Sequence, residues 1–292
     1  MKKTLLMAAA LLCLPCLANA QDEAPASPWT HNGITGLNLS SSSFTNWSEG
    51  GENSTSGNVY FNASLNYNKG KSSWTNDLDA NFGLMKTQTQ ADWRKNMDNI
   101  HLASKYGRQI TDKLYYAFLL DFKTQFAPGY DYATDPKTRL SDFMTPAYLN
   151  LSVGLDYKPD EHVSVYLSPA AGKMTYVKDT LFSTAYGLEQ GKHLRMEFGA
   201  TFKASANYAF FGDKLTVRSD VDMFTAYNES FGNVDINWNL LVGFKLSQYI
   251  TATFQSCLKY DDDIHCFAAD GTDQGPKVQF KEVLGLGLSY QF

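Results

Sequence analysis

The sequence predicts an all-β protein, a transmembrane antiparallel up-and-down β-barrel of about 12 strands, from three observations. Apolar and polar residues alternate over long segments, short and long connections between these segments alternate, and the chain ends inside an apolar strand. Beyond residue 20, no stretch approaches the ~20 consecutive apolar residues that a membrane helix requires. Mean hydropathy is −0.32, but alternation hides a lipid-compatible face in such an average.

The N-terminus has the pattern of a secretory signal peptide. Lys2 and Lys3 precede an apolar run from Leu5 to Leu17, and Ala18-Asn19-Ala20 is a small-x-small cleavage site. We therefore expect a signal peptide at 1–20 and an outer-membrane β-barrel at 21–292. Cleavage removes both lysines and changes the formal net charge from −5 to −7. This acidic balance argues against a nucleic-acid partner.

Four segments show the alternation most clearly. Each carries apolar residues at nearly every second position and mainly polar or charged residues between them, as expected for a strand between lipid and a lumen. They exceed the ~5–6 residues of typical soluble strands and match the ~9–11 that cross a bilayer at a tilt. The segments are Val59–Tyr67, Leu114–Phe126, Leu194–Tyr208 and Val234–Leu246.

Tight turns and longer links strictly alternate along the chain. Outer-membrane barrels distribute periplasmic turns and extracellular loops in this way, and the pattern places both termini on the periplasmic side. The tight turns are Asn68–Lys71, Gln109–Lys113, Lys158–Glu161, Gly212–Lys214 and Ser247–Gln248. The longer links are Phe44–Ser56, Lys86–Lys95, Ala127–Thr145, Lys178–Lys192, Tyr227–Asn233 and Asp261–Lys277.

The final segment, Val283–Phe292, places large apolar residues on one face and small or polar residues on the other. Such a strand needs a partner on each edge, which a closed barrel provides by pairing its last strand with its first. Aromatic residues near the short-turn ends of the outward faces fit a girdle at the headgroup level. They are Tyr67, Trp74, Tyr106, Tyr116, Tyr157, Tyr208, Tyr290 and Phe292.

Five blocks of sequence resemble an outer-membrane β-barrel family of Gram-negative bacteria that is catalogued as a domain of unknown function. The blocks are Asn46–Ser54, Trp74–Asp79, Leu167–Lys173, Tyr260–Ile264 and Gln279–Gly287. The resemblance extends over nearly the whole mature chain and implies a barrel in the cell outer membrane. Because the family has no established activity, it implies no functional residues. By resemblance to other outer-membrane barrels, Tyr290 and Phe292 form the signal for the outer-membrane assembly machinery.

The alternation turns charges of both signs toward the lumen in similar numbers. Balanced charges either pair across a narrow lumen and brace it, or line a water-filled pore with weak ion preference. We expect the narrower lumen, because long links such as Ala127–Thr145 have the length to fold inward. The predicted lumen residues are His101, the acidic residues Asp77, Asp79, Asp121, Asp156, Glu197, Asp220, Asp222 and Asp235, and the basic residues Lys105, Lys123, Arg195, Lys203, Arg218, Lys245, Lys259 and Lys281.

Two further groups of residues suggest specific chemistry. Cys257 and Cys266 are the only cysteines of the mature chain, and an oxidising compartment permits a disulfide between them or leaves two free thiols. Asp261 and Asp263 offer hard oxygen ligands for a divalent cation in a loop. Their spacing matches no EF-hand, and acidic loop tips are usually only solvated, so we predict no metal site and no cofactor.

An enzyme is not expected. A hydrolase needs a histidine near a serine and an orienting acid, and the chain contains no G-x-S-x-G elbow. His101 falls on the lumen face of its strand, whereas an outer-membrane lipase would act at the outer surface. We therefore interpret His101 as a polar lumen residue.

The predicted function is a narrow channel or transporter for small solutes, with a loop-restricted and charge-balanced lumen. The alternative is a non-conducting structural barrel, or one whose long loops bind an extracellular ligand that the sequence does not identify. Either would have the lipid bilayer as its main partner.

Overall fold

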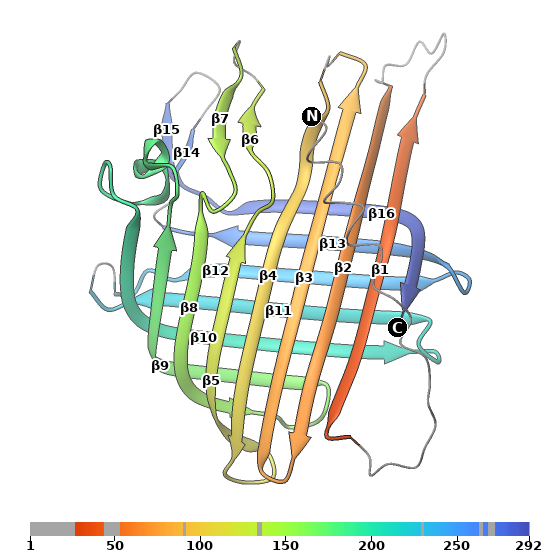
Figure 1. Ribbon diagram of the computed structural model, residues 1–292, viewed down its shortest axis with the longest axis vertical. Helices are drawn as coiled ribbons and strands as arrows, with labels where there is room; N and C mark the ends of the chain where they lie inside the picture. Colours follow the sequence, from red (N-terminus) through yellow and green to blue (C-terminus); the bar gives the residue numbers. More distant parts are fainter. Residues whose placement is uncertain are drawn as a thin grey trace.

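The computed structural model describes residues 27–43, 53–89, 92–132, 136–228, 231–262, 265–267 and 272–291 of the chain. Twelve strands form one closed barrel in which neighbouring strands are antiparallel (Figure 1). The predicted fold class and the predicted number of strands are therefore confirmed. The proposed signal peptide and the terminal Phe292 lie outside the described residues.

The barrel strands follow one another up and down, and the last strand pairs with the first. Figure 1 shows the front strands crossing the back ones steeply, as in a barrel with strongly tilted strands. The order around the barrel is β1 (Trp29–Ser42), β16 (Gln279–Gln291), β13 (Ile250–Tyr260), β12 (Asp235–Lys245), β11 (Leu215–Ala226), β10 (Leu194–Phe210), β9 (Val163–Tyr176), β8 (Ala147–Tyr157), β5 (Leu114–Thr124), β4 (Arg94–Gln109), β3 (Ser72–Thr87) and β2 (Ser54–Lys69).

Smaller elements lie in the long connections, at one end of the barrel (Figure 1). We call this end the loop end and the opposite one the turn end. The small elements are the hairpin of β6 (Gly129–Asp131) and β7 (Thr138–Ser141), the 3-10 helices η1 (Thr180–Phe182) and η2 (Thr184–Tyr186), and the hairpin of β14 (His265–Phe267) and β15 (Asp273–Pro276). Among the described residues, no helix is long and apolar enough to cross a membrane.

The tight turns at the turn end depend on left-handed backbone conformations. Gly70, between β2 and β3, has φ 58°, a conformation that glycine adopts without a Cβ clash. Between β10 and β11 the three residues Phe211, Gly212 and Asp213 all have positive φ values, of 56°, 64° and 63°. Turns of this kind match the twist of the strands that they join and fix the register of the hairpin.

The strands present an apolar outer face and a more polar inner face, as the alternation predicts. On β2, Val59 exposes 52% of its surface while Tyr60 exposes 6%, and on β10, Phe198 exposes 56% while Glu197 exposes 5%. The apolar cluster buried inside is small, because among the described residues it joins Ala117, Leu119 and Tyr166. The exposed outer face therefore belongs to a protein whose surroundings are apolar.

Aromatic side chains gather at the turn end of the outer face. Trp29, which the sequence did not single out, lies with its ring centroid 5.0 Å from that of Tyr67 and 5.8 Å from that of Trp74. Tyr116 and Tyr290 also point outward and are exposed. This arrangement is typical of the interfacial girdle of a membrane barrel.

The strands β1 and β16 close the barrel through five residue pairs, from Ile34 with Gln291 to Asn38 with Gly287. The backbone there leaves no room for side chains at the glycines. A Cβ atom on Gly287 would collide with the carbonyl oxygen of Leu37 and with the side chain of Asn38. The closing pair therefore requires glycine at this position.

We predict that Gly287→Ala destabilises the barrel, because the new methyl group must push β1 and β16 apart. A loss of about 1–3 kcal/mol in the free energy of unfolding is expected from overpacking of this kind. Gly172→Ala is the matched control, since a Cβ on Gly172 would meet no atom within 4 Å. Urea unfolding in detergent micelles measures both variants. Equal unfolding midpoints would contradict the importance of this close approach.

Candidate functional site in the barrel lumen

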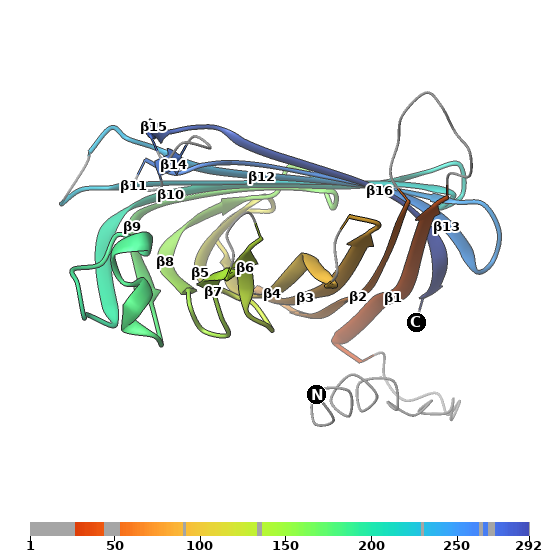
Figure 2. The same ribbon diagram turned by 90° about the horizontal axis from the view of Figure 1, so that it is seen from above.

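A cavity of about 1230 Å³ occupies the interior of the barrel. At the turn end Asn68 and Lys158 line it, and at the loop end Met97 and Lys259 do. Figure 2 shows β10 to β13 and β16 on one side of the interior and the curved sheet of β1 to β5, β8 and β9 on the other. The cavity therefore extends along the barrel between two walls that lie close enough for side chains to meet.

Most of the predicted lumen residues line this cavity. They are Asp77, Asp79, His101, Lys105, Asp121, Lys123, Lys203, Arg218, Asp220, Asp222, Lys259 and Lys281. The other five predicted residues, Asp156, Arg195, Glu197, Asp235 and Lys245, are not part of the lining.

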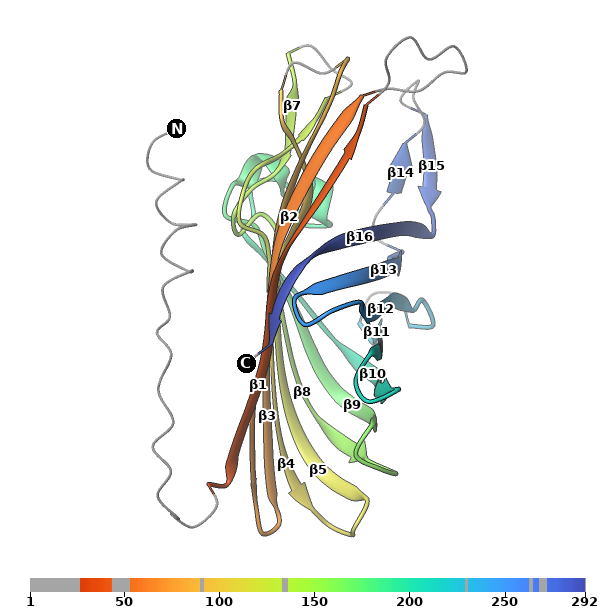
Figure 3. The ribbon, with the colours of Figure 1, turned by 90° about the vertical axis from the view of Figure 1, so that its right-hand side faces the viewer.

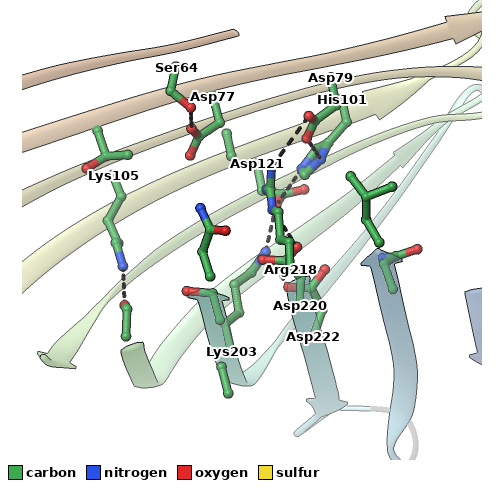
Figure 4. Close-up of a pocket in the computed structure, with 18 of the residues that line it drawn as sticks. Ser64, Asp77, Asp79, His101, Lys105, Asp121, Lys203, Arg218, Asp220 and Asp222 are labelled. Carbon is green, nitrogen blue, oxygen red and sulfur yellow. Dashed lines mark hydrogen bonds and ion pairs between the residues drawn. The ribbon is translucent and has the colours of Figure 1, made fainter. Parts of the chain in front are cut away.

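A cluster of ion pairs crosses the middle of the lumen (Figure 4). The Lys203 Nζ lies 2.6 Å from Asp121 Oδ2 and 2.9 Å from Asp222 Oδ1. The Lys123 Nζ lies 3.0 Å from Asp222 Oδ2 and 3.7 Å from Asp121 Oδ1. Two carboxylates and two ammonium groups from β5, β10 and β11 therefore compensate one another. Since Asp121 is only 1% exposed, this pairing is needed to offset the loss of hydration.

Arg218 extends this cluster to the opposite wall. Its Nε donates a hydrogen bond of 2.8 Å to Asp220 Oδ2, and its Nη1 lies 3.7 Å from Asp79 Oδ1. The strands that carry Arg218 and Asp79, β11 and β3, are six strands apart in either direction around the barrel. The two walls of the barrel are thus joined across its full width.

His101 links the two halves of the cluster. Its Nε2 lies 3.1 Å from Asp121 Oδ2, and its Nδ1 lies 3.5 Å from Asp79 Oδ2. Both ring nitrogens therefore face carboxylates, which places the imidazole as a bridge between β3 and β5. We call the eight residues Asp79, His101, Asp121, Lys123, Lys203, Arg218, Asp220 and Asp222 the central cluster.

A second group of charges lies nearer the turn end. The Lys105 Nζ lies 2.8 Å from Asp156 Oδ2 and donates to Ser164 Oγ at 2.7 Å. Lys158 approaches the same carboxylate at 3.7 Å. Burial and the nearby ammonium of Lys105 lower the pKa of Lys158. The sequence placed Lys158 in a tight turn. The only signal for its contact with the lumen was its position directly after the strand that carries the inward-facing Asp156.

A third group of charges lies at the loop end. Lys173 on β9 contacts Asp235 on β12 at 2.6 Å and Glu197 on β10 at 3.7 Å, and Arg195 contacts Glu197 at 3.3 Å. Lys173 is not among the predicted lumen residues. Its inward direction follows a β-bulge between β8 and β9, which breaks the simple alternation that sequence reasoning used.

The described residues of the link between β5 and β8 are not part of the cavity lining, so the inward fold expected for Ala127–Thr145 stays a prediction. Figure 1 shows β6 and β7 of this link rising beyond the ends of β5 and β8. The base of the link is held at the wall of the cavity by Asp98, which lines the cavity and accepts hydrogen bonds from the amides of Phe126 and Ala127 at 2.7 and 3.0 Å.

The same link forms part of an ordered cap at the loop end. Arg139 contacts Asp142 at 2.9 Å and also pairs with Asp179, which precedes η1. The Tyr186 hydroxyl donates to the Leu140 carbonyl at 3.1 Å, and burial raises the pKa of Tyr186 to about 12. The β6–β7 hairpin and the two 3-10 helices therefore support one another at the loop end.

The remaining candidate residues show no special site. Cys257 and Cys266 are both free, so the disulfide that the sequence left open is not formed in the structure. Asp263 lies outside the described residues, and within the described part no group of three or more metal-ligating side chains is found. Asp262 instead accepts hydrogen bonds from Asn233 and from the Tyr260 hydroxyl.

Comparisons with known proteins agree with this architecture. Residues 39–130 match a family described as "Protein of unknown function (DUF3078)", which bears out the resemblance to an uncharacterised family. No curated protein matches the chain. Similar solved structures include the NanC porin, with 7% identity over 88% of this chain and 98% of that chain and a TM-score of 0.41.

Two further solved structures are similar to the chain. One is an outer membrane channel from Pseudomonas putida F1, with 11% identity, coverage of 94% of this chain and 100% of that one, and a TM-score of 0.40. The other is the translocator domain of the autotransporter NalP from Neisseria meningitidis, with 9% identity, coverage of 100% and 98%, and a TM-score of 0.38. The barrel fold itself is established by the strand pairing of this chain.

We predict that Asp121→Asn destabilises the protein, because it leaves two buried ammonium groups with one carboxylate between them. The expected loss in the free energy of unfolding is about 2–4 kcal/mol, which is at or below the cost of breaking an ion pair that is fully shielded from water. Asp213→Asn is the matched control, since Asp213 is exposed in a tight turn at positive φ, where asparagine is well tolerated. Urea unfolding compares the two variants, and a loss no larger for Asp121→Asn would contradict the structural role of the cluster.

Proposed function

We propose that the protein is a narrow channel of the bacterial outer membrane for small solutes, in which the central cluster limits what passes. The observation that carries this proposal is the cavity that reaches from the turn end to the loop end and is lined by polar side chains along its length. A barrel with only a structural role has no need of such a continuous polar path. A packed interior would stabilise it equally well.

The placement in the outer membrane is supported by three features of the surface. The outer face is apolar, aromatic residues gather at the turn end, and the connections alternate in length. Closure of the sheet removes the unpaired strand edges that lipid does not tolerate. We further propose that residues 1–20 are removed as a signal peptide during export.

The charge distribution supports weak selectivity between anions and cations. In the central cluster each ammonium or guanidinium group lies near a carboxylate, so the net field along the path is small. Selection would then act mainly through size and through the ability of a solute to compete for hydrogen bonds. Small polar solutes fit these conditions.

A non-conducting barrel is the alternative, and one observation favours it. The contact between Arg218 and Asp79 joins strands on opposite sides of the barrel, which stiffens the wall and narrows the path. If the cluster never opens, the cavity is two vestibules rather than a channel. Single-channel recording distinguishes the two functions.

We predict that the purified protein produces small conductance steps in a planar lipid bilayer, and that Arg218→Ala increases their size severalfold. The variant removes the side chain that spans the lumen, and Asp79 keeps its contact with His101. Arg108→Ala is the matched control, because Arg108 is exposed near the turn end and does not line the cavity.

The absence of steps from correctly folded protein in repeated reconstitutions would refute the channel. Equal step sizes for the parent and Arg218→Ala would refute the central cluster as its constriction. Heat-modifiable mobility in gel electrophoresis verifies that each variant is folded.

We also propose that the C-terminal aromatic residue is recognised by the outer-membrane assembly machinery. Deletion of Phe292 is expected to lower the amount of protein in the outer membrane, while the fraction that does assemble keeps the parental conductance. Immunoblotting of membrane fractions measures the amount of protein in the outer membrane. No residue of the 1–20 segment is deleted for comparison, because such a deletion would affect export. Unchanged membrane levels would contradict the proposal.

A further inference from the structure

The junction between β1 and β16 is paired over only part of its length. The two strands share five residue pairs, whereas β1 pairs with β2 along all of its residues from Trp29 to Ser42, and β16 pairs with β13 over ten. Figure 3 shows β1 and β2 continuing toward the loop end while β16 turns away together with β13. The barrel wall therefore splits above the closing pair.

The split exposes backbone edges at the depth of the apolar outer face. Among the described residues, neither Leu39–Ser41 of β1 nor Gln279–Leu286 of β16 has a strand partner across the junction. Continued register would place Leu39 opposite Leu286, and these two leucines expose 65% and 56% of their surfaces. The open edge of β16 is on the order of 20 Å long, at the usual rise per strand residue.

Such an edge cannot face hydrocarbon without compensation. Unpaired amide and carbonyl groups in lipid cost several kcal/mol each. The wedge between β1 and β16 must therefore hold water from the lumen or a guest molecule with polar atoms. The lumen reaches this place, because Gln279, Phe280, Lys281 and Val283 of the open edge all line the cavity.

The lumen beside the split carries positive charge without paired acids. Lys281 on β16 and Lys259 on β13 are diagonal neighbours on the same face, since Cys257 lies opposite Lys281 and Lys259 opposite Gln279. The Lys281 Nζ donates to the Asn96 carbonyl at 2.9 Å. Within the described part of the chain, neither lysine has a carboxylate at ion-pair distance. This contrasts with the compensated charges of the central cluster.

The wedge joins these two environments in one place. Its outer rim is apolar at Leu284, which is exposed to 78%, and at Leu286 and Leu39 beside it, while Glu282 on the same face adds a charge farther along β16. Its inner side has two neighbouring ammonium groups and the polar lumen. Asn38 is buried and lies at the apex of the wedge. Its side-chain amide nitrogen would be 3.1 Å from a Cβ atom added to Gly285. A molecule that fits here has an anionic head and one flexible apolar chain.

We propose that the split between β1 and β16 is a lateral portal for membrane-derived fatty acids and similar single-chain anionic amphiphiles. The carboxylate binds between Lys259 and Lys281 on the lumen side, and the chain lies along Leu39, Leu284 and Leu286 toward the lipid. The carboxylate replaces the missing acidic partner of the lysines, and the chain shields the open strand edges from the bilayer. This site goes beyond the axial conduction proposed above and does not depend on it.

Binding is tested with the full mature chain in phosphatidylcholine nanodiscs, using a stearic acid that is spin-labelled on its chain. A bound chain contributes an immobilised component to the electron paramagnetic resonance spectrum, which empty nanodiscs lack. The methyl ester of the same probe has no charge and should give a smaller immobilised component. Heat-modifiable mobility verifies the folding of every variant.

Two variants locate the binding site. Lys259→Gln combined with Lys281→Gln should weaken stearate binding roughly tenfold and leave ester binding unchanged. Lys69→Gln combined with Lys71→Gln is the matched control, because Lys69 is the exposed last residue of β2 and Lys71 lies in the exposed turn that follows. In a background without native cysteines, Leu286→Cys labelled with a bulky maleimide should prevent binding of the chain, whereas labelled Leu155→Cys on β8 should not.

Several results would overturn the portal. Stearate immobilised equally in the parent, the double lysine variant and the labelled Leu286→Cys variant would show only general contact with lipid. Equal binding of acid and ester would refute recognition of the anion. If sedimentation instead reveals a dimer that the label at position 286 dissociates, the edge pairs with a second copy and holds no amphiphile. None of these measurements depends on conductance. The test therefore remains decisive even if the protein does not conduct along the barrel axis.

Discussion

Backbone amide and carbonyl groups cannot be left unpaired in hydrocarbon, and this constraint determines most of the structure. It requires a sheet that closes on itself, so the chain forms strands of 11 to 17 residues that are long enough to cross a bilayer at a tilt. Closure gives the sheet an outside and an inside, and the period-two alternation assigns each residue to one of them. Charged side chains are thereby collected in a confined interior.

Charges confined in this way must find partners, because their hydration is incomplete. Asp121 has almost no contact with solvent and is compensated by Lys203 and Lys123 from two other strands. Arg218 reaches across the barrel to Asp79. The contacts that stabilise the walls are thus the same ones that narrow the path between them. Under the proposed function, stability and permeability would be linked through one set of side chains.

The alternation in sequence was sufficient to predict the strands, their faces and the side of each turn. It identified the inward direction of residues such as Asp79, His101 and Lys203, because direction depends only on neighbours along the strand. It could not predict which charges meet, since Arg218 and Asp79 approach only through the tilt and flattening of the whole barrel. Lys173 was missed because a β-bulge shifts the alternation of β8 and β9.

The long link between β5 and β8 illustrates a second limit. Its length permitted a plug, and the hydrogen bonds that Asp98 accepts hold its base at the wall of the cavity. No local pattern in the link itself encodes these contacts, because the partner lies on β4. The incomplete pairing of β1 with β16 is likewise a property of the closed barrel rather than of either strand.

The order of the strands also has a consequence for the way the chain reaches its native state. Every junction of the barrel except one joins strands that are neighbours along the barrel chain and can form before the rest of the barrel has assembled. The exception joins Leu37 to Leu288, about 250 residues away, so its entropic cost of closure is the largest in the molecule. The barrel is therefore expected to grow as an open curved sheet from successive hairpins and to close in one late step. The short glycine-lined pair of β1 and β16 is the contact that completes folding.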